Sequence, residues 1–112
     1  MASVDEVWLL DFGAPYPGEP ASRRPAVIVG PARQFTDAVP PIIVCPLTTT
    51  KRPLSVHIEV EATPDNGLDE TSYVQCELVR AVSPRRLVHR LGTVEAQVIE
   101  QVRWVLGALL DF

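Results

Sequence analysis

Cysteine is scarce in this sequence. Its two copies, Cys45 and Cys76, lie in separate apolar segments and form no Cys-x-x-Cys pair. That spacing supports neither a zinc site nor a dithiol redox site. We therefore expect two buried, reduced thiols in a cytoplasmic protein, with no metal and no cofactor.

Targeting signals and common catalytic motifs are also missing. No basic region precedes a long apolar core, and no apolar run approaches the roughly 20 residues that a membrane-spanning helix needs. We therefore expect no contact with a membrane. The sequence shows no phosphate-cradling glycine loop, no readable Ser/His/Asp or Cys/His arrangement and no internal repeat.

An excess of positive charge is absent as well, because the net charge is −4. This argues against a general nucleic-acid binder. The charges are nevertheless unevenly distributed: residues 13–56 hold five basic and two acidic side chains, and acids cluster between Glu59 and Glu70. One face can thus be positive and bind a short single-stranded segment.

The hydrophobic pattern predicts a single domain, 1–112, that is mainly β (α+β). Its 112 residues, 46% of them hydrophobic, suffice for one core. Trp8 and Phe12 share one face of the first strand, and His57 and Glu59 share the polar face of another. Pro46 is expected to end the central strand, and Glu77 to interrupt a long one. The predicted strands are 7–12, 26–29, 42–45, 56–60 and 73–82.

Helical spacing marks the C-terminal segment. Thr93 is a candidate N-cap, and Glu95 would support the first turn electrostatically. An apolar stripe follows at Val98, Ile99, Val102, Val105, Leu106 and Leu109. Ser83 and Pro84 predict the start of a short helix. Together these patterns favour a small, strongly curved antiparallel sheet with a C-terminal amphipathic helix.

The stretch from Gly13 to Arg24 is a long loop, since Pro15, Pro17, Gly18 and Pro20 preclude regular structure. It ends in Arg24, directly before Pro25 and an apolar strand. Proline favours an extended conformation for the residue before it, so Arg24 enters the strand in a defined position. A guanidinium held this way can offer two parallel hydrogen bonds to a phosphate.

Several ordered motifs resemble MazF/PemK-type toxins, the mRNA endoribonucleases of type II toxin–antitoxin pairs. The resemblance covers nearly the whole chain. The motifs are Glu6–Phe12, Gly18-Glu19, Arg24–Val29, Pro46–Thr50, Val56–Val60, Gly67-Leu68, Val79–Val82 and Arg90–Val94.

That resemblance implies the SH3-like barrel of MazF, CcdB and Kid toxins and a homodimer. It also implies metal-independent cleavage of single-stranded RNA to 2′,3′-cyclic phosphate and 5′-hydroxyl ends, with neutralisation by a cognate antitoxin. It places the catalytic arginine and threonine at Arg24 and Thr48, and it makes Glu19 a candidate base. The expected RNA-binding residues are Arg23, Thr49, Thr50, Lys51, Arg52 and Glu77.

Three alternatives accompany this interpretation. One is an inactive relative that serves only as a binding module, which RNA binding without cleavage would indicate. A non-enzymatic toxin that poisons DNA gyrase, as CcdB-type proteins do, would share the fold, although it would need no phosphate clamp. His57 and His89 could form a histidine-based ribonuclease, but neither has a local partner motif, so we expect structural roles for both. Many family members carry Asp-Gln where this chain has Glu77-Leu78, so an amide that could read a base edge is absent.

Overall fold

The computed structural model describes residues 2–14, 16–17, 22–36 and 38–112. These residues form a seven-stranded antiparallel sheet and a C-terminal helix, joined by turns and three short 3₁₀ helices. The elements are β1 (Glu6–Asp11), β2 (Arg23–Gly30), η1 (Arg33–Phe35), β3 (Ile42–Thr48), β4 (His57–Val60), β5 (Ser72–Gln75), η2 (Cys76–Leu78), β6 (Arg80–Val82), η3 (Pro84–Arg86), β7 (Leu87–Thr93) and α1 (Ala96–Leu109).

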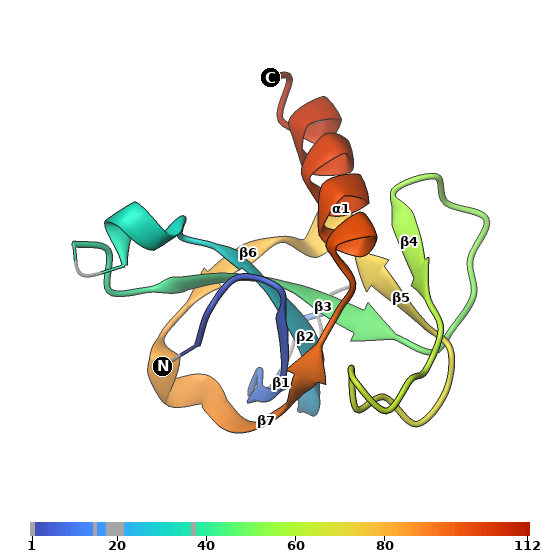
Figure 1. Ribbon diagram of the computed structural model, residues 1–112, viewed down its shortest axis with the longest axis horizontal. Coiled ribbons are helices and arrows are strands. Elements are labelled where there is room, and N and C mark those ends of the chain that lie inside the picture. The colour runs from blue at the N-terminus through green and yellow to red at the C-terminus, as the bar shows by residue number, and fades with distance from the viewer. Residues whose placement is uncertain (1, 15, 18–21, 37) are drawn as a thin grey trace.

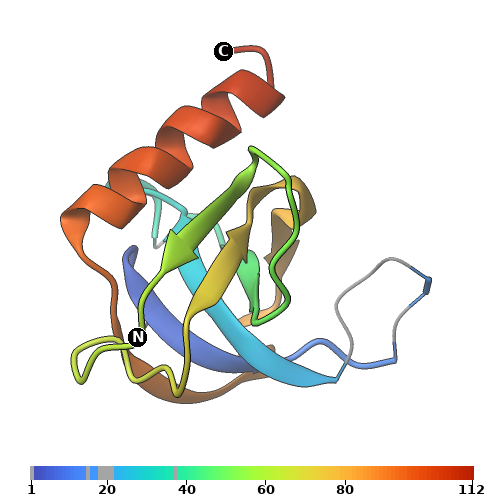
Figure 2. The same cartoon turned by 90° about the vertical axis from the view of Figure 1, so that its right-hand side faces the viewer.

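The sheet is strongly curled, as expected, and α1 lies against one side of it (Figures 1 and 2). Its strands follow the order β4-β5-β3-β2-β1-β7, and β6 pairs with β3. In the described part of the chain no pairing joins β4 to β7. The sheet is therefore a curled open version of the predicted barrel, with an edge at each end.

The pairing of β3 corrects two predictions. One edge of this strand pairs first with β6 and then with β5. It pairs with β6 through Ile42–Val44 and with β5 through Leu47 and Thr48. Pro46 lies between these two ladders, where its missing N–H breaks no pairing with β5 or β6, so the strand continues to Thr48. The predicted long strand over 73–82 is wrong, because η2 divides it into β5 and β6.

Strand β7 is a further element that the pattern does not predict. It pairs with β1 in a register that shifts at two places, between Val7 and Trp8 and between Leu9 and Leu10. Irregularities of this kind interrupt the alternation of faces that marks a strand in the sequence. Three consecutive residues of β7, Val88–Arg90, are exposed as a result.

Both faces of the sheet bury apolar side chains. One cluster lies between the sheet and α1 and contains Val7, Val27, Cys45, Val74, Ile99 and Val102, among others. The other contains Leu10, Phe12, Ala26, Ile28, Ile42, Val44 and Val82, with Trp8 packed against it. Trp8 and Phe12 thus share a face, as predicted. Neighbouring residues of β2 and β3 alternate between the clusters because side chains alternate along a strand.

Helix α1 covers the first cluster with Ile99 and Val102, and Val98, Val105 and Leu106 pack beside them. The predicted N-cap is wrong: Thr93 ends β7, and Glu95 occupies the N-cap position without a side-chain cap bond. Leu109 lies at the exposed end of the apolar stripe.

The 3₁₀ helix η3 begins as predicted, since the Ser83 hydroxyl oxygen accepts a hydrogen bond from the Arg85 backbone N–H. No helix in the described ranges is long and apolar enough to cross a membrane.

Candidate active site

Arg24 and Thr48 come together at one end of the β2–β3 pair. The register pairs Ala26 with Pro46 and Ile28 with Val44. Continued by two residues, the same register sets Arg24 of β2 opposite Thr48, the last residue of β3. Side chains directly opposite one another in antiparallel strands lie on the same face and within reach of each other. Two positions 24 residues apart in the sequence are thereby neighbours.

One nitrogen of the Arg24 guanidinium is hydrogen-bonded, and another has no partner among the described residues. Its Nη1 donates a 3.4 Å hydrogen bond to Oε1 of Gln75 in β5. Its Nε–H is buried and has no hydrogen-bond partner among the described residues. A buried donor left unpaired costs roughly 1–3 kcal/mol. An acceptor that reached this N–H would recover that cost.

Polar side chains continue from Arg24 across three more strands. Thr48 pairs with Tyr73, Tyr73 pairs with Glu59, and Gln75 pairs with His57. Opposite residues share a face, as do residues two apart, so all of these side chains lie on one side of the sheet. We call this surface the polar face; it comprises Arg24, Thr48, Tyr73, Gln75, His57 and Glu59.

His57 has a partner that its sequence neighbours do not reveal. Its Nε2 lies 2.8 Å from Oε2 of Glu77 in η2, and Nδ1 is buried without a partner among the described residues. The His57 side chain is 2% exposed, although it lies on the polar face of β4, whereas that of Glu77 is 32% exposed. The two residues are 20 positions apart, so only the tertiary structure brings them together.

Arg80 is a second cation on this side of the sheet. It pairs with Val44, which sets its side chain on the same face as the second cluster. Its guanidinium carbon lies 5.6 Å from the centroid of the Phe12 ring, a cation–π distance. The sequence motif Val79–Val82 contains Arg80 but gives no reason to select it.

The remaining predicted RNA-binding residues lie around this surface without joining it. Thr49, Thr50, Lys51 and Arg52 are exposed in the segment after β3, where the Thr50 backbone N–H donates to Oγ1 of Thr48 at 3.2 Å. Arg23 is exposed at the start of β2. The predicted base, Glu19, lies outside the described residues.

The two cysteines are free and buried, as expected. They pack in one cluster, and the contact with Cys76 together with burial raises the pKa of the Cys45 thiol well above its usual range. Cys45 therefore stays protonated. Within the described ranges no group of three or more His, Cys, Asp or Glu side chains is arranged to hold a metal ion.

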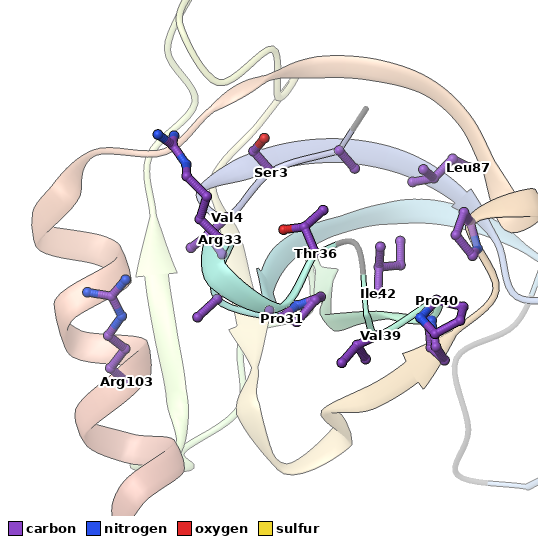
Figure 3. A pocket seen from close by; sticks show the side chains of 15 residues that line it. Ser3, Val4, Pro31, Arg33, Thr36, Val39, Pro40, Ile42, Leu87 and Arg103 are labelled. Atoms are coloured by element: carbon purple, nitrogen blue, oxygen red, sulfur yellow. The ribbon is translucent and has the colours of Figure 1, made fainter.

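A cavity of about 530 Å³ lies at the opposite end of β2 and β3 from Arg24 and Thr48. Pro31, Ile42 and Leu87 contribute apolar walls, and Arg33 and Arg103 lie at one side (Figure 3). None of the predicted site residues lines it. The cavity and the polar face are therefore separate surfaces.

Comparison with known proteins identifies the family. Residues 4–110 match the family model described as PemK-like, MazF-like toxin of type II toxin–antitoxin system. MazF from Deinococcus radiodurans is similar in structure, with a TM-score of 0.84 and 23% identity over 99% of this chain and 97% of that one. The Mycobacterium tuberculosis toxin MazF-mt6 gives a TM-score of 0.75 and 20% identity over 96% and 97%.

An antitoxin-bound structure is also similar. An endoribonuclease in complex with its cognate antitoxin, from a mycobacterial species, gives a TM-score of 0.79 and 19% identity. The match covers 100% of this chain and 97% of that one. At these identities the likeness establishes the fold that the sequence predicts.

Proposed function

We propose that this chain, which belongs to the PemK-like, MazF-like toxins of type II toxin–antitoxin systems, is an endoribonuclease that cuts single-stranded mRNA at a short sequence. The observation that carries the proposal is the Nε–H of Arg24, which is buried without a partner among the described residues and lies at the same end of β2 and β3 as Thr48. A phosphate oxygen is an acceptor that would satisfy this donor.

Arg24 has the chemistry of a phosphate clamp. Gln75 holds one side of its guanidinium, so less side-chain entropy is lost when the other side binds. Negative charge grows on the non-bridging oxygens as the ribose 2′-oxygen attacks phosphorus. A fixed guanidinium stabilises that charge more than it stabilises the ground state, which lowers the barrier.

Thr48 would donate its hydroxyl hydrogen bond to another phosphate oxygen. Its Oγ1 already accepts from the Thr50 backbone N–H, so the hydroxyl proton is directed away from that contact. Attack by the 2′-oxygen needs no metal ion and leaves a 2′,3′-cyclic phosphate and a 5′-hydroxyl. Arg23, Thr49, Thr50, Lys51 and Arg52 would bind the flanking phosphates, and Glu77 would contact the same RNA.

The reaction also needs a group that accepts the 2′-OH proton. Arginine is a poor acceptor because its pKa exceeds ~12. A carboxylate is the natural candidate, and the chain offers Glu19, which precedes β2 in the sequence, and Glu77 in η2.

A homodimer and an antitoxin complete the proposal. Large apolar side chains are exposed on α1 and beyond it: Trp104 at 77%, Leu110 at 55% and Phe112 at 97%. An apolar surface of this kind favours association with a second copy. We propose that the cognate antitoxin places an acidic, apolar segment over the RNA-binding surface. Titration calorimetry with a non-cleavable RNA should then show mutually exclusive binding, and a ternary complex would contradict it.

The decisive experiment is cleavage of a long single-stranded RNA in EDTA, with the cut ends mapped. Wild-type protein should cut at discrete sites, and Arg24→Ala and Thr48→Ala should each lower kcat by about 10²-fold or more. Arg103→Ala, a change in an exposed arginine on α1, should cut like the wild type. Intact RNA with folded, antitoxin-free wild type would contradict the proposal and direct attention to gyrase.

A further inference from the structure

His57 is a buried titratable group to which the proposed mechanism gives no task. Its ring is 2% exposed, and one of its two nitrogens is buried without a partner in the described part of the chain. The other nitrogen, Nε2, is 2.8 Å from the Glu77 carboxylate. An ionised carboxylate only accepts hydrogen bonds, so with Glu77 ionised the donor in this contact is the Nε2–H of His57. The histidine thus binds a carboxylate from the interior of the protein.

A cross-strand pair connects the His57–Glu77 contact to Arg24, the proposed phosphate clamp. His57 on β4 is directly opposite Gln75 on β5, and Gln75 accepts the hydrogen bond from Arg24. Glu77 follows Gln75 by two residues and is the middle residue of η2. Arg24, Gln75, His57 and Glu77 therefore form a continuous group drawn from four elements, with Arg24 and Glu77 at its two ends.

Exposure differs along this group in a way that suits catalysis. The histidine is enclosed, whereas the Glu77 side chain remains 32% exposed. Its Oε2 is the oxygen fixed by His57, so Oε1 is left to contact a substrate. A group whose rotamer is locked by a buried neighbour holds a productive geometry better than a free surface carboxylate does.

We propose that His57 is a positioning residue of the active site, and that the Glu77 carboxylate it holds accepts the 2′-OH proton; the inference rests on the proposed ribonuclease function. The ribose 2′-OH gives its proton to Glu77, and the 2′-oxygen forms a bond to phosphorus. The bond from phosphorus to the 5′-oxygen breaks, and that oxygen takes a proton from a water molecule. Glu77 afterwards returns its proton to solvent.

The experiment compares amide substitutions that differ in reach. In His57→Gln the side-chain amide lies near the position of Nε2 and can still donate to Glu77, whereas in His57→Asn it lies near Nδ1 and cannot. The substrate is a short single-stranded RNA that contains one site mapped with the wild type. We expect His57→Asn to lower kcat by about 10- to 100-fold with little change in KM. His57→Gln should restore most of the rate.

Glu77→Gln tests the acceptor itself at a partly exposed position, so this variant does not depend on tolerance of a change in the interior. It should lower kcat by about 10²- to 10⁴-fold. Because His57 acts through Glu77, the double variant His57→Asn/Glu77→Gln should be no slower than Glu77→Gln alone. His89→Asn, at the other histidine, is exposed on β7 and should cut like the wild type.

Several results would overturn the inference. One is a wild-type kcat in His57→Asn or in Glu77→Gln. Another is a double variant whose loss of kcat equals the product of the two single losses. A third is a loss of kcat in Glu19→Gln but not in Glu77→Gln. Each of these leaves the ribonuclease function in place, because the wild type still cuts. If the wild type itself cuts no RNA, the proposed function fails and the inference fails with it.

Discussion

Arg24 shows how much of one side chain's environment comes from distant parts of the chain. Leu10 of β1 is its neighbour on one side, and Gln75 of β5 accepts its hydrogen bond on the other. The extended conformation that Pro25 favours therefore acts on a residue that has partners in two other strands. A guanidinium in such a place is pre-organised, since the protein holds its orientation before any phosphate arrives.

The Glu6 carboxyl gives a prediction about how stability depends on pH. Burial alone would raise the pKa of its carboxyl. Hydrogen bonds from the Trp8 indole, the Ser3 backbone N–H and Arg90 outweigh that effect and hold the pKa below its ordinary value. A carboxyl with a lowered pKa stabilises the fold above its unfolded pKa of about 4.3, and the contribution disappears as the pH falls through the folded value.

We therefore expect Glu6→Gln to lower the free energy of unfolding by about 1–2 kcal/mol at pH 7. The difference from the wild type should shrink as the pH falls below about 4. Urea denaturation at a series of pH values measures both. Glu100→Gln is the control, since that carboxylate is 74% exposed and pairs with Arg103 on the same helix. A difference for Glu6→Gln that persists unchanged at pH 3 would exclude the ionic origin.

At the scale of elements, the 3₁₀ helix η2 decides the geometry of the site. It ends β5 after Gln75 and turns the chain so that β6 returns to a different part of β3. The same turn directs Glu77 toward His57 on β4.

The turn from Ala62 to Thr71 packs closely against β7, and two glycines permit the contact. Gly67 has φ +70°, and a Cβ there would collide with the Leu91 carbonyl. A Cβ on Gly92 would likewise collide with the Asp65 carbonyl oxygen. Asn66 is 3% exposed, and its side-chain oxygen accepts hydrogen bonds from the Thr63 and Leu68 backbone N–H groups. The Asn66-Gly67 pair is a local turn signal in the sequence, but only the structure shows which strand the turn packs against.

We expect Gly67→Ala to destabilise the protein by about 3 kcal/mol, since both the backbone conformation and the space oppose a Cβ. Gly107→Ala is the matched control. It lies in α1 with no atom near its Cβ position and should stabilise the protein by about 1 kcal/mol. Urea denaturation compares them, and equal effects of the two changes would contradict this account.

For the whole molecule, the apolar surface on and after α1 is a feature that the fold leaves uncovered. The inner side of the helix packs on the first cluster, while Trp104 on the outer side is 77% exposed. Burying one Trp side chain contributes strongly to an interface, because aromatic residues dominate such contacts.

If this surface forms the proposed homodimer, Trp104→Glu should convert the protein to a monomer, because a charge would be buried without a partner. Size-exclusion chromatography with light scattering measures the mass. Gln101→Glu adds the same charge at another exposed position of α1 and should leave the mass unchanged. A Trp104→Glu variant with the wild-type mass would rule out this surface as the interface.

The sequence by itself determined those features that local patterns encode. Alternation and Pro/Gly punctuation gave the strands over 7–12, 26–29 and 56–60, and helical spacing gave α1, because burial on one side leaves a periodic trace in the chain. The curled sheet follows from these elements and from the family resemblance. Arg24 was predicted as a site residue from Pro25 and the loop before it, and Thr48 from its place in the family motif; both roles stay predictions.

Tertiary structure alone decided the features that depend on which strands become neighbours. The pairing of β3 with both β5 and β6, the irregular β7 and the contact between His57 and Glu77 join residues far apart in sequence. The register of β2 and β3, which sets Arg24 opposite Thr48 when it is continued by two residues, is of the same kind. Pairing and register are selected by burial of the whole core at once, so no short stretch of sequence carries that information.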